Sequence, residues 1–447
     1  MMNLHDQNRP IDRRKFVELT ALGGGAILLG SLPGCDPRTP GADSAAAAVG
    51  HGFSEAGLQR MHDTFAAHVA SGKAPGLVTL VSRRGQVAVD AIGTKALGSQ
   101  DPMTRDTIFR IASMTKPITA VAAMILVEES AFRLEDSVEK FLPELANRRV
   151  LKNVDGPLDE TVPARRAISI EDLLTFRMGF GLLFPMDTRP IQKKAIELGV
   201  GIPMPPFIHP APEPNEWLRR FATLPLMAQP GEKWLYHTGS ELLGILIARA
   251  SGQDLPTFLS ERIFHPLGMS DTGFSVPAAK LSRLPAAYFS NPQTKTIEAF
   301  DTAQKSTWSN PPSFPSGGGG LVTTVDDYHT FARMLLNKGE HAGKRILAAR
   351  SVDAMTKDHL TPEQKSVSGL FPGFFDGRGW GFGVSMVTEP DSISPTPGRY
   401  GWDGGFGTHW FNDPAQDLVA MIMTQRAIDE TFPAFMFQKA VYEAIEN

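Results

Sequence analysis

The chain has 447 residues, of which 42% are hydrophobic and 21% charged, so it is long enough to bury a large core and to form two lobes. Its net charge of −4 gives no electrostatic case for binding nucleic acid or an anionic membrane surface, and we expect neither as a partner. A single cysteine excludes an intrachain disulfide framework and a cysteine-rich metal site.

The N-terminus has the features of an export signal rather than of a folded segment. Arg13 and Arg14 precede a short, glycine-containing apolar stretch that is too weak to span a membrane, a pattern that resembles a twin-arginine signal. Cys35 lies in a context similar to a lipoprotein processing site. We therefore expect residues 1–35 to be an export signal and the protein to be periplasmic or secreted, with membrane contact only through lipidation at Cys35, which stays open.

Residues 36–52 are rich in Pro, Gly, Ala and Ser and are expected to form a linker. After it, the spacing of apolar residues predicts a helix over 54–69 and then a hairpin whose strands are 76–82 and 86–91. The end of the chain mixes helical and alternating patterns. There we expect a helix over 325–336 capped by Thr324, strands over 379–387, 407–411 and 418–424, and a last helix over 433–445.

Strands near both ends, with helical pieces and proline-rich loops between them, predict an α/β fold in which one sheet is built from both parts of the chain. We expect an α/β lobe formed by residues 53–129 and 301–447. An all-α lobe, residues 130–300, would be inserted between these two parts. A cleft between lobes is a common position for a small-molecule site.

A serine and a lysine stand three residues apart where a buried helix is predicted to begin, at Ser113 and Lys116. Pro117 fits only the first turn of a helix, which places Ser113 at or just before the N-terminus. Lys116 can therefore reach the serine hydroxyl and, when desolvated, accept its proton. The local sequence leaves a nucleophile and an ordinary N-cap serine equally open. Ser137 and Lys140 have the same spacing, but the acids around Ser137 predict a turn or cap.

Two further segments carry polar groups next to predicted elements. Residues 236–238 (Tyr-His-Thr) precede an apolar helix that ends near Gly252, and residues 402–405 (Trp-Asp-Gly-Gly) lie between two strands. Each has an ordinary explanation, because a tyrosine before a helix is usually a core-edge residue and Trp-X-Gly usually marks packing and a tight turn.

Taken in order, the three segments resemble the serine β-lactamase and penicillin-binding-protein family. That family pairs a Ser-X-X-Lys helix start with a Tyr-X-Asn or similar loop and a Lys-Thr-Gly or equivalent strand. The chain is most similar to the β-lactamase-fold (family VIII) carboxylesterases, in which the third motif is commonly Trp-X-Gly. The resemblance covers roughly residues 53–445. It implies the β-lactamase/transpeptidase-like fold, an antiparallel sheet flanked by helices with the inserted helical lobe.

The resemblance also implies a role for each residue. Ser113 would attack the carbonyl carbon, while Lys116 and Tyr236 share the removal of its proton. To act as an anionic base, Tyr236 would need its pKa lowered from about 10 to near neutral by a cation such as Lys116; whether it is an anion or a proton relay stays open. The backbone N–H groups of Ser113 and Gly405 would form the oxyanion hole. The residues expected to contact substrate are Thr238, Trp402, Asp403 and Gly404.

Departures from the β-lactamase pattern predict a preference for esters. Thr238 replaces the asparagine that offers its amide to a β-lactam, and Trp402 replaces the lysine that faces the β-lactam carboxylate. An aromatic residue there suits an uncharged or apolar acyl group better. Unless its side chain points away, Asp403 would add negative charge near the cleft and further disfavour a carboxylate.

We therefore expect a serine hydrolase that cleaves short acyl esters of small molecules through an acyl-enzyme on Ser113, with no cofactor and no metal. A β-lactamase, a D-amino-acid peptidase or amide hydrolase, and an acyltransferase would use the same machinery. The alternative from another class is a penicillin-binding sensor that is acylated once. The physiological substrate and the oligomeric state stay open.

Other prominent features have structural explanations. The histidines lack the helical pair spacing of a metal site. His237 and His409 could line the cleft, but we expect them to be ordinary polar residues near loops. Arg110 is expected to be a structural ion-pair partner. The glycines at 317–320 lack the lysine and hydroxyl residue of a phosphate loop and predict close backbone packing.

Overall fold

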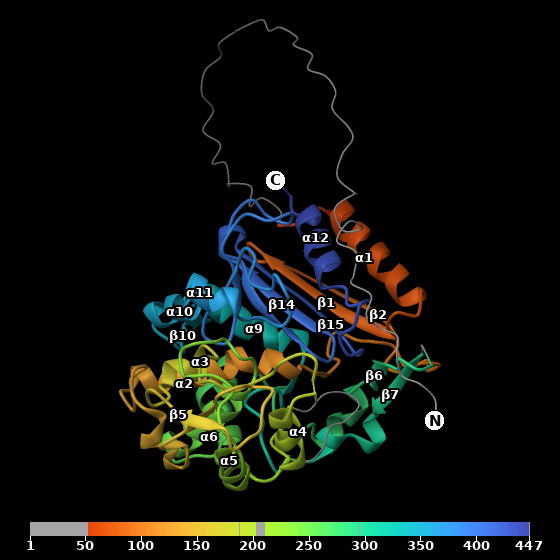
Figure 1. The fold of residues 1–447 in the computed structure, drawn as a ribbon. Helices are drawn as coiled ribbons and strands as arrows, with labels where there is room; N and C mark the ends of the chain where they lie inside the picture. Colours follow the sequence, from red (N-terminus) through yellow and green to blue (C-terminus); the bar gives the residue numbers. More distant parts are fainter. Residues whose placement is uncertain (1–51, 187, 203–210, 295, 447) are drawn as a thin grey trace, which may run out of the picture. The chain divides into compact units, whose positions relative to one another are not determined.

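The computed structural model describes residues 52–186, 188–202, 211–294 and 296–446 (Figure 1). The predicted export signal, Cys35 and almost all of the predicted linker lie outside the described residues, so these assignments stay predictions. Within the described part of the chain, no helix is long and apolar enough to cross a membrane.

Both ends of the chain contribute strands to one antiparallel sheet. In the described residues it has seven strands, in the order β11-β12-β13-β14-β15-β1-β2. The last strand, β15, pairs with the first, β1, and places Met421 opposite Leu80. The predicted hairpin, β1 with β2, is confirmed. The strand bounds are β1 Gly76–Arg83, β2 Gln86–Gly93, β11 Arg378–Trp380, β12 Ser385–Val387, β13 Tyr400–Gly404, β14 Thr408–Asp413 and β15 Leu418–Thr424.

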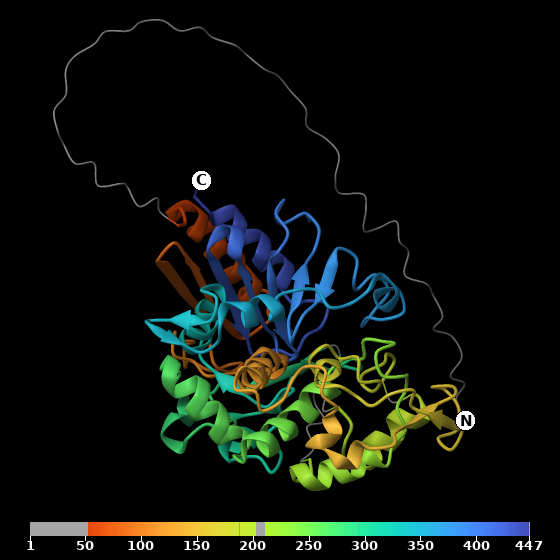
Figure 2. The same ribbon diagram turned by 90° about the vertical axis from the view of Figure 1, so that its left-hand side faces the viewer.

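Helices cover both faces of this sheet (Figures 1 and 2). On one face, α1 (Glu55–Ala70) lies beside α12 (Ala434–Ala444), and the rings of Phe65 and Phe437 are 5.9 Å apart. On the other face lies α9 (Val325–Leu336), whose Tyr328 ring contacts Trp410 of β14 at 5.4 Å. All three helices confirm the sequence predictions. The predicted cap also holds, because Thr324 accepts a hydrogen bond from an N–H in the first turn of α9.

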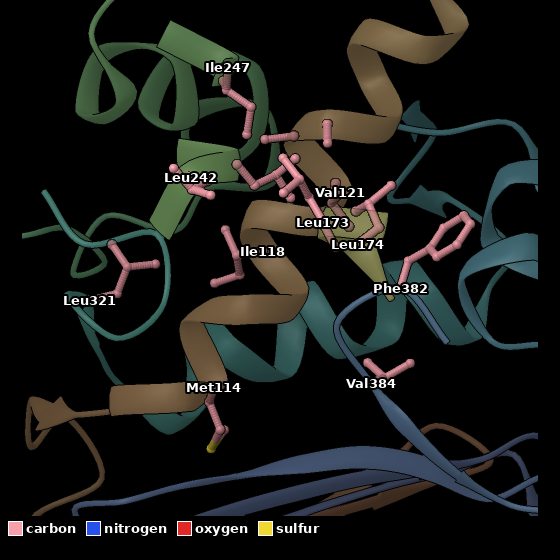
Figure 3. Close-up of a cluster of buried hydrophobic side chains, with 14 of the residues drawn as sticks. Met114, Ile118, Val121, Leu173, Leu174, Leu242, Ile247, Leu321, Phe382 and Val384 are labelled. Carbon is pink, nitrogen blue, oxygen red and sulfur yellow. The ribbon is translucent and has the colours of Figure 1, made fainter. Parts of the chain in front are cut away.

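Helix α2 (Thr115–Glu128) runs through the middle of the larger core (Figure 3). Its residues are buried from Thr115 to Leu126. Figure 3 shows Ile118 and Val121 among apolar side chains of α3 (Ile170–Leu174) and α6 (Thr238–Ser251). Each such side chain stabilises the fold by about 1.5–3 kcal/mol on burial. The helix that begins just after Ser113 is therefore a fixed support for it.

The segment predicted as an all-α lobe is mostly helical but needs correction. It contains two short antiparallel pairs, β4 (Arg149–Leu151) with β5 (Thr161–Pro163) and β6 (Ala287–Ser290) with β7 (Ile297–Asp301). Strands this short do not show a clear alternating pattern in the sequence. The lobe boundaries at 130 and 300 stay predictions. The other helices of this segment are α4 Pro190–Glu197, α5 Pro214–Ala222, α7 Leu255–Leu259 and α8 His265–Leu267.

The strand predicted over 379–387 is broken into β11 and β12. Gly383, in the connection, has φ of +74°, a conformation that favours glycine and turns the chain back on itself. The segment around Trp402, predicted as a turn, is the strand β13. The remaining short elements are β3 Phe109–Arg110, β8 Val322–Thr323, β9 Glu340–His341, β10 Lys344–Arg345, α10 Ala349–Met355 and α11 Pro362–Ser366.

Arg110 is the structural ion-pair partner that the sequence predicts. Its guanidinium pairs with Asp301, and both side chains are buried. The same guanidinium donates to the Pro285 carbonyl oxygen at 2.7 Å. Because a buried charge is costly without a partner, this pair holds β3, the strand that leads to Ser113, against β7.

Candidate active site

Ser113 lies in a single 3₁₀ turn, Ala112–Met114, between β3 and α2. The preceding Ala112 has φ of +40°, a left-handed conformation that costs an L-residue on the order of 1 kcal/mol or more. The sharp turn leaves Ser113 half-buried while its neighbours are buried. The structure therefore places Ser113 just before the helix, as predicted. By contrast Ser137 is a cap that accepts from the Glu139 N–H, also as predicted.

The amine of Lys116 is buried and faces the serine. Its Nζ lies 2.9 Å from Ser113 Oγ, 2.6 Å from the Gly318 carbonyl oxygen and 3.1 Å from His237 Nδ1. Burial lowers the pKa of Lys116 to about 7, although the charge of Glu241 acts to raise it. At neutral pH a large fraction of this amine is therefore unprotonated and able to accept the serine proton.

Tyr236 lies on the loop before α6, with its hydroxyl at the serine. The hydroxyl accepts a hydrogen bond from Trp402 Nε1 at 2.6 Å and is close enough to Ser113 for that side chain to act on its pKa. Lys116 Nζ lies 4.5 Å from the centre of the tyrosine ring. Burial raises the pKa of Tyr236, although Ser113 and Trp402 both act to lower it. This shift is opposite to the one a tyrosinate base requires, so burial favours a neutral tyrosine that relays a proton, with Lys116 as the base.

The backbone holds Tyr236 in place from one side. The Leu182 N–H donates to the Tyr236 carbonyl oxygen at 2.9 Å, and the Leu235 N–H donates to the Phe176 carbonyl oxygen at 2.8 Å. A β-carbon at Gly181 would lie 2.5 Å from the Tyr236 carbonyl oxygen, so only glycine fits this approach.

Alternation along β13 separates the residues of the third motif. Trp402 faces Tyr236, with ring centroids 5.5 Å apart. Asp403 points to the opposite face, where its carboxylate lies 2.5 Å from His409 Nδ1, and His409 packs against α12 at Phe437. The structure therefore does not bring Asp403 into the site, and the expected substrate contact by this carboxylate is not supported.

The remaining predicted site residues are the two glycines of the third motif and Thr238. Gly404 packs tightly against the Ile111 carbonyl, two residues before Ser113. Gly405 follows it, and a β-carbon there would have no atom of the described residues within 4 Å, so this backbone borders open space. Thr238 is buried at the start of α6. The oxyanion hole of Ser113 and Gly405 stays a prediction.

An aromatic wall, which the sequence analysis missed, surrounds Tyr236 and Trp402. Trp380 contacts Trp402 at 4.6 Å, and Trp234 contacts Tyr236 at 5.5 Å. These apolar side chains come from segments far apart in the chain, so no local pattern connects them. The aromatic-rich stretch at 371–380 was the available signal. The wall residues are Phe176, Trp234, Phe374, Phe375, Trp380 and Trp402.

His237, which we expected to be an ordinary polar residue rather than one that lines the cleft, lies in the middle of the site. It contacts Lys116 through Nδ1, while its Nε2 lies 2.9 Å from Glu241 Oε1. The spacing of four residues between His237 and Glu241 was a signal in the sequence, because such residues share a helix face. Close packing of the glycines is confirmed, since a β-carbon at Gly318 would lie 2.7 Å from Glu241 Oε1. Among the described residues, no group of three or more His, Cys, Asp or Glu is placed to hold a metal.

The Beta-lactamase family model matches residues 61–441. The chain belongs to this family. Protein Rv1367c of Mycobacterium tuberculosis (strain ATCC 25618 / H37Rv) is 40% identical over 365 residues, which cover 80% of this chain and 88% of the relative. Esterase EstB of Burkholderia gladioli is 29% identical over 374 residues, covering 79% and 86%.

The fold is shared with solved structures. EstCE1, a hydrolase with promiscuous acyltransferase activity, superposes with a TM-score of 0.71 at 23% identity, covering 87% of this chain and 99% of EstCE1. The β-lactamase/transpeptidase-like α/β fold and the family resemblance predicted from the three motifs are both confirmed.

Proposed function

We propose that this protein is a serine hydrolase that cleaves uncharged carboxylic esters through an acyl-enzyme on Ser113. The observation that carries the proposal is the 2.9 Å contact between the buried Lys116 amine and the hydroxyl of Ser113, a half-buried residue. A base with a pKa near the operating pH is well matched to removing the serine proton. EstB, which shares most of the chain length, is named an esterase.

The contacts support a sequence of proton transfers. As Ser113 Oγ forms a bond to the ester carbonyl carbon, its proton passes to Lys116 Nζ. When the C–O bond to the leaving alcohol breaks, the neutral Tyr236 hydroxyl donates its proton to that oxygen and regains one from Lys116. Water then attacks the acyl-enzyme by the same route in reverse and releases the acid.

The surroundings of Ser113 favour an apolar, uncharged substrate. The wall beside Tyr236 consists of tryptophan and phenylalanine side chains, and Trp402 occupies the position where a lysine would attract a carboxylate. The Asp403 carboxylate lies against His409 on the opposite face of β13, so we do not assign it a contact with the substrate. The argument for esters over β-lactams therefore rests on Trp402 and the aromatic wall.

The test is a comparison of kcat/KM for p-nitrophenyl butyrate and for a chromogenic cephalosporin on the same preparation. We expect the ester to be preferred by at least about 100-fold, and Ser113→Ala to abolish ester turnover with loss of the acyl adduct seen by intact-protein mass. Faster cephalosporin turnover would instead indicate a β-lactamase. One equivalent of product without further turnover would indicate a sensor, and faster product release with an added alcohol would indicate an acyltransferase.

Tyr236→Phe is expected to lower kcat/KM for the ester by about 100-fold or more, because it removes the proton donor and leaves Trp402 Nε1 without its acceptor. The matched control is Tyr442→Phe on α12, across the sheet, which should keep full activity. Steady-state kinetics on both variants, with circular dichroism to verify folding, checks this. Equal rates for the two variants would exclude a role for the Tyr236 hydroxyl.

A further inference from the structure

A buried chain of polar groups continues beyond Lys116, away from Ser113. His237 Nδ1 lies 3.1 Å from Lys116 Nζ, and His237 Nε2 lies 2.9 Å from Glu241 Oε1. Glu241 accepts a hydrogen bond from the Ser316 hydroxyl at 2.6 Å. Lys116, His237 and Glu241 are each less than 10% exposed. Burying an ionisable group without a partner costs folding free energy. A buried row of three such groups therefore indicates a function.

The partners fix the protonation of the histidine. The charge of Glu241, whose Oε1 lies 2.9 Å from His237 Nε2, favours a proton on that nitrogen, while burial, followed by the charge of Lys116, lowers the pKa of His237. Burial works to raise the pKa of Glu241, but His237, Ser316 and Lys116 together hold it below its ordinary value. The consistent state is a carboxylate beside a neutral imidazole protonated at Nε2. Its Nδ1 is then a hydrogen-bond acceptor.

This state has a geometric consequence for the Lys116 amine. A neutral amine has two N–H bonds and one lone pair. His237 Nδ1 and the Gly318 carbonyl oxygen are two acceptors at hydrogen-bond distance, so each takes one N–H. The third neighbour is Ser113 Oγ, and the lone pair is left to face it. This is the orientation in which the amine can accept the serine proton.

The backbone of His237 shows that the position is constrained. Its φ of +86° and ψ of −61° form a γ-turn, closed by a 3.3 Å hydrogen bond from the Thr238 N–H to the Tyr236 carbonyl oxygen. This turn is rare and strained for a residue other than glycine. Gly318 completes the enclosure, because a β-carbon there would lie 3.0 Å from His237 Cε1. The imidazole is thus held in one orientation by both backbone and packing.

We propose that His237 and Glu241 are positioning residues that hold the neutral Lys116 amine with its lone pair directed at Ser113. The inference rests on the proposed function, since it describes how the same nucleophile is activated. It assigns a task to the variable middle residue of the second motif, His237, and to Glu241, which lies outside the three motifs. The two side chains act through Lys116 and do not touch the substrate.

The proposal predicts a shift in pH dependence. The titratable groups around Lys116 are Tyr236 and His237 just before α6, Glu241 on α6, and Asp403, which acts on Tyr236 from β13. Glu241 raises the pKa of Lys116 through its charge. Glu241→Gln removes that charge, so the protonated lysine becomes less favourable. The rise of reactivity with pH should then begin at lower pH.

The experiment measures the rate at which an alkyl fluorophosphonate modifies Ser113, followed by intact-protein mass from pH 5 to 9. In this reaction the Oγ–P bond forms, the P–F bond breaks, fluoride leaves and the serine proton passes to Lys116. For Glu241→Gln we expect the midpoint to move down by about one pH unit and the plateau rate to fall by about 10- to 100-fold. A structural role alone would lower the melting temperature without moving the midpoint.

Two substitutions at His237 test the roles of its two ring nitrogens separately. His237→Asn keeps an acceptor near the Nδ1 position, whereas His237→Gln places its polar atoms near Nε2. We expect the asparagine variant to keep a plateau rate at least about tenfold above that of the glutamine variant. The matched control is His68→Gln, a buried histidine on α1 whose charged neighbours are Lys73, Arg426 and Asp429, and its profile should match that of the unaltered protein.

The outcomes distinguish this inference from the proposed function. An unchanged midpoint together with a plateau within twofold of the unaltered protein in Glu241→Gln would overturn the positioning role. Modification of Ser113 without ester turnover in the unaltered protein would contradict the proposed ester hydrolysis. The orientation of Lys116 would still be tested by the modification rates of the variants. Absence of modification at Ser113 in the unaltered protein would overturn both.

Discussion

Lys116→Met is expected to reduce kcat/KM for ester hydrolysis by at least about 1,000-fold, because methionine fills a similar volume but cannot accept a proton. The amine is the group in contact with Ser113 Oγ that has a pKa near neutrality. A stopped or continuous assay with a nitrophenyl ester measures the loss. Lys140→Met is the matched control, since Lys140 is exposed and has the same spacing from Ser137.

The role of Lys116 as the base determines how the activity of the unaltered protein depends on pH. Lys116 must be unprotonated to act, so kcat/KM should rise with pH through a midpoint of about 7. Below this pH the amine carries its proton and the rate falls tenfold per pH unit. A profile that is flat between pH 5 and 9, or ester turnover that survives Lys116→Met, would show that another group is the base.

Gly404→Ala is expected to lower the free energy of unfolding by about 2–3 kcal/mol. We also expect the folded variant to be less active than the unaltered protein. A β-carbon at Gly404 would overlap the carbonyl oxygen of Ile111, a backbone atom that cannot move aside without displacing the turn of Ser113. The expected result is therefore a shift of β13 away from the nucleophile. Guanidinium unfolding gives the stability, and the fluorophosphonate rate reports the serine.

The neighbouring glycine provides the control. Gly405→Ala adds the same methyl group where no atom of the described residues lies within 4 Å, so its unfolding free energy should change by less than about 0.5 kcal/mol. Similar destabilisation by both substitutions would mean that loss of glycine flexibility, rather than the contact with Ile111, decides the effect.

The family and the nucleophile could be predicted because their signals are local. Pro117 restricts where the helix begins, and the three-residue spacing sets Lys116 on the face of Ser113. The caps and apolar periods of α1, α9 and α12 depend on near neighbours in the chain as well. The acidic residues next to Ser137 are also a local signal, and they are enough to distinguish this cap residue from the nucleophile Ser113.

The roles within the site required the tertiary structure. Whether Asp403 faces the cleft depends on the register of β13 in the sheet, and Trp402-Asp403-Gly404 is too short a run to reveal a strand. The state of Tyr236 depends on burial by Trp234 and Trp380, residues brought together only by folding. Desolvation and charge shift a pKa through space, so a local sequence pattern cannot predict these shifts.

By itself, the sequence determined the family, the position of Ser113 and Lys116 at a helix start, and the sheet shared by both ends of the chain. These follow from hydrophobic periods, caps and short spacings, which are properties of neighbouring residues. Only the tertiary structure decided that Lys116 is buried with a pKa near 7, that Tyr236 stays neutral, and that His237 and Glu241 lie behind the amine. Each of these depends on groups that the fold brings within about 4 Å from distant parts of the chain, where low polarity makes their charges act strongly on one another.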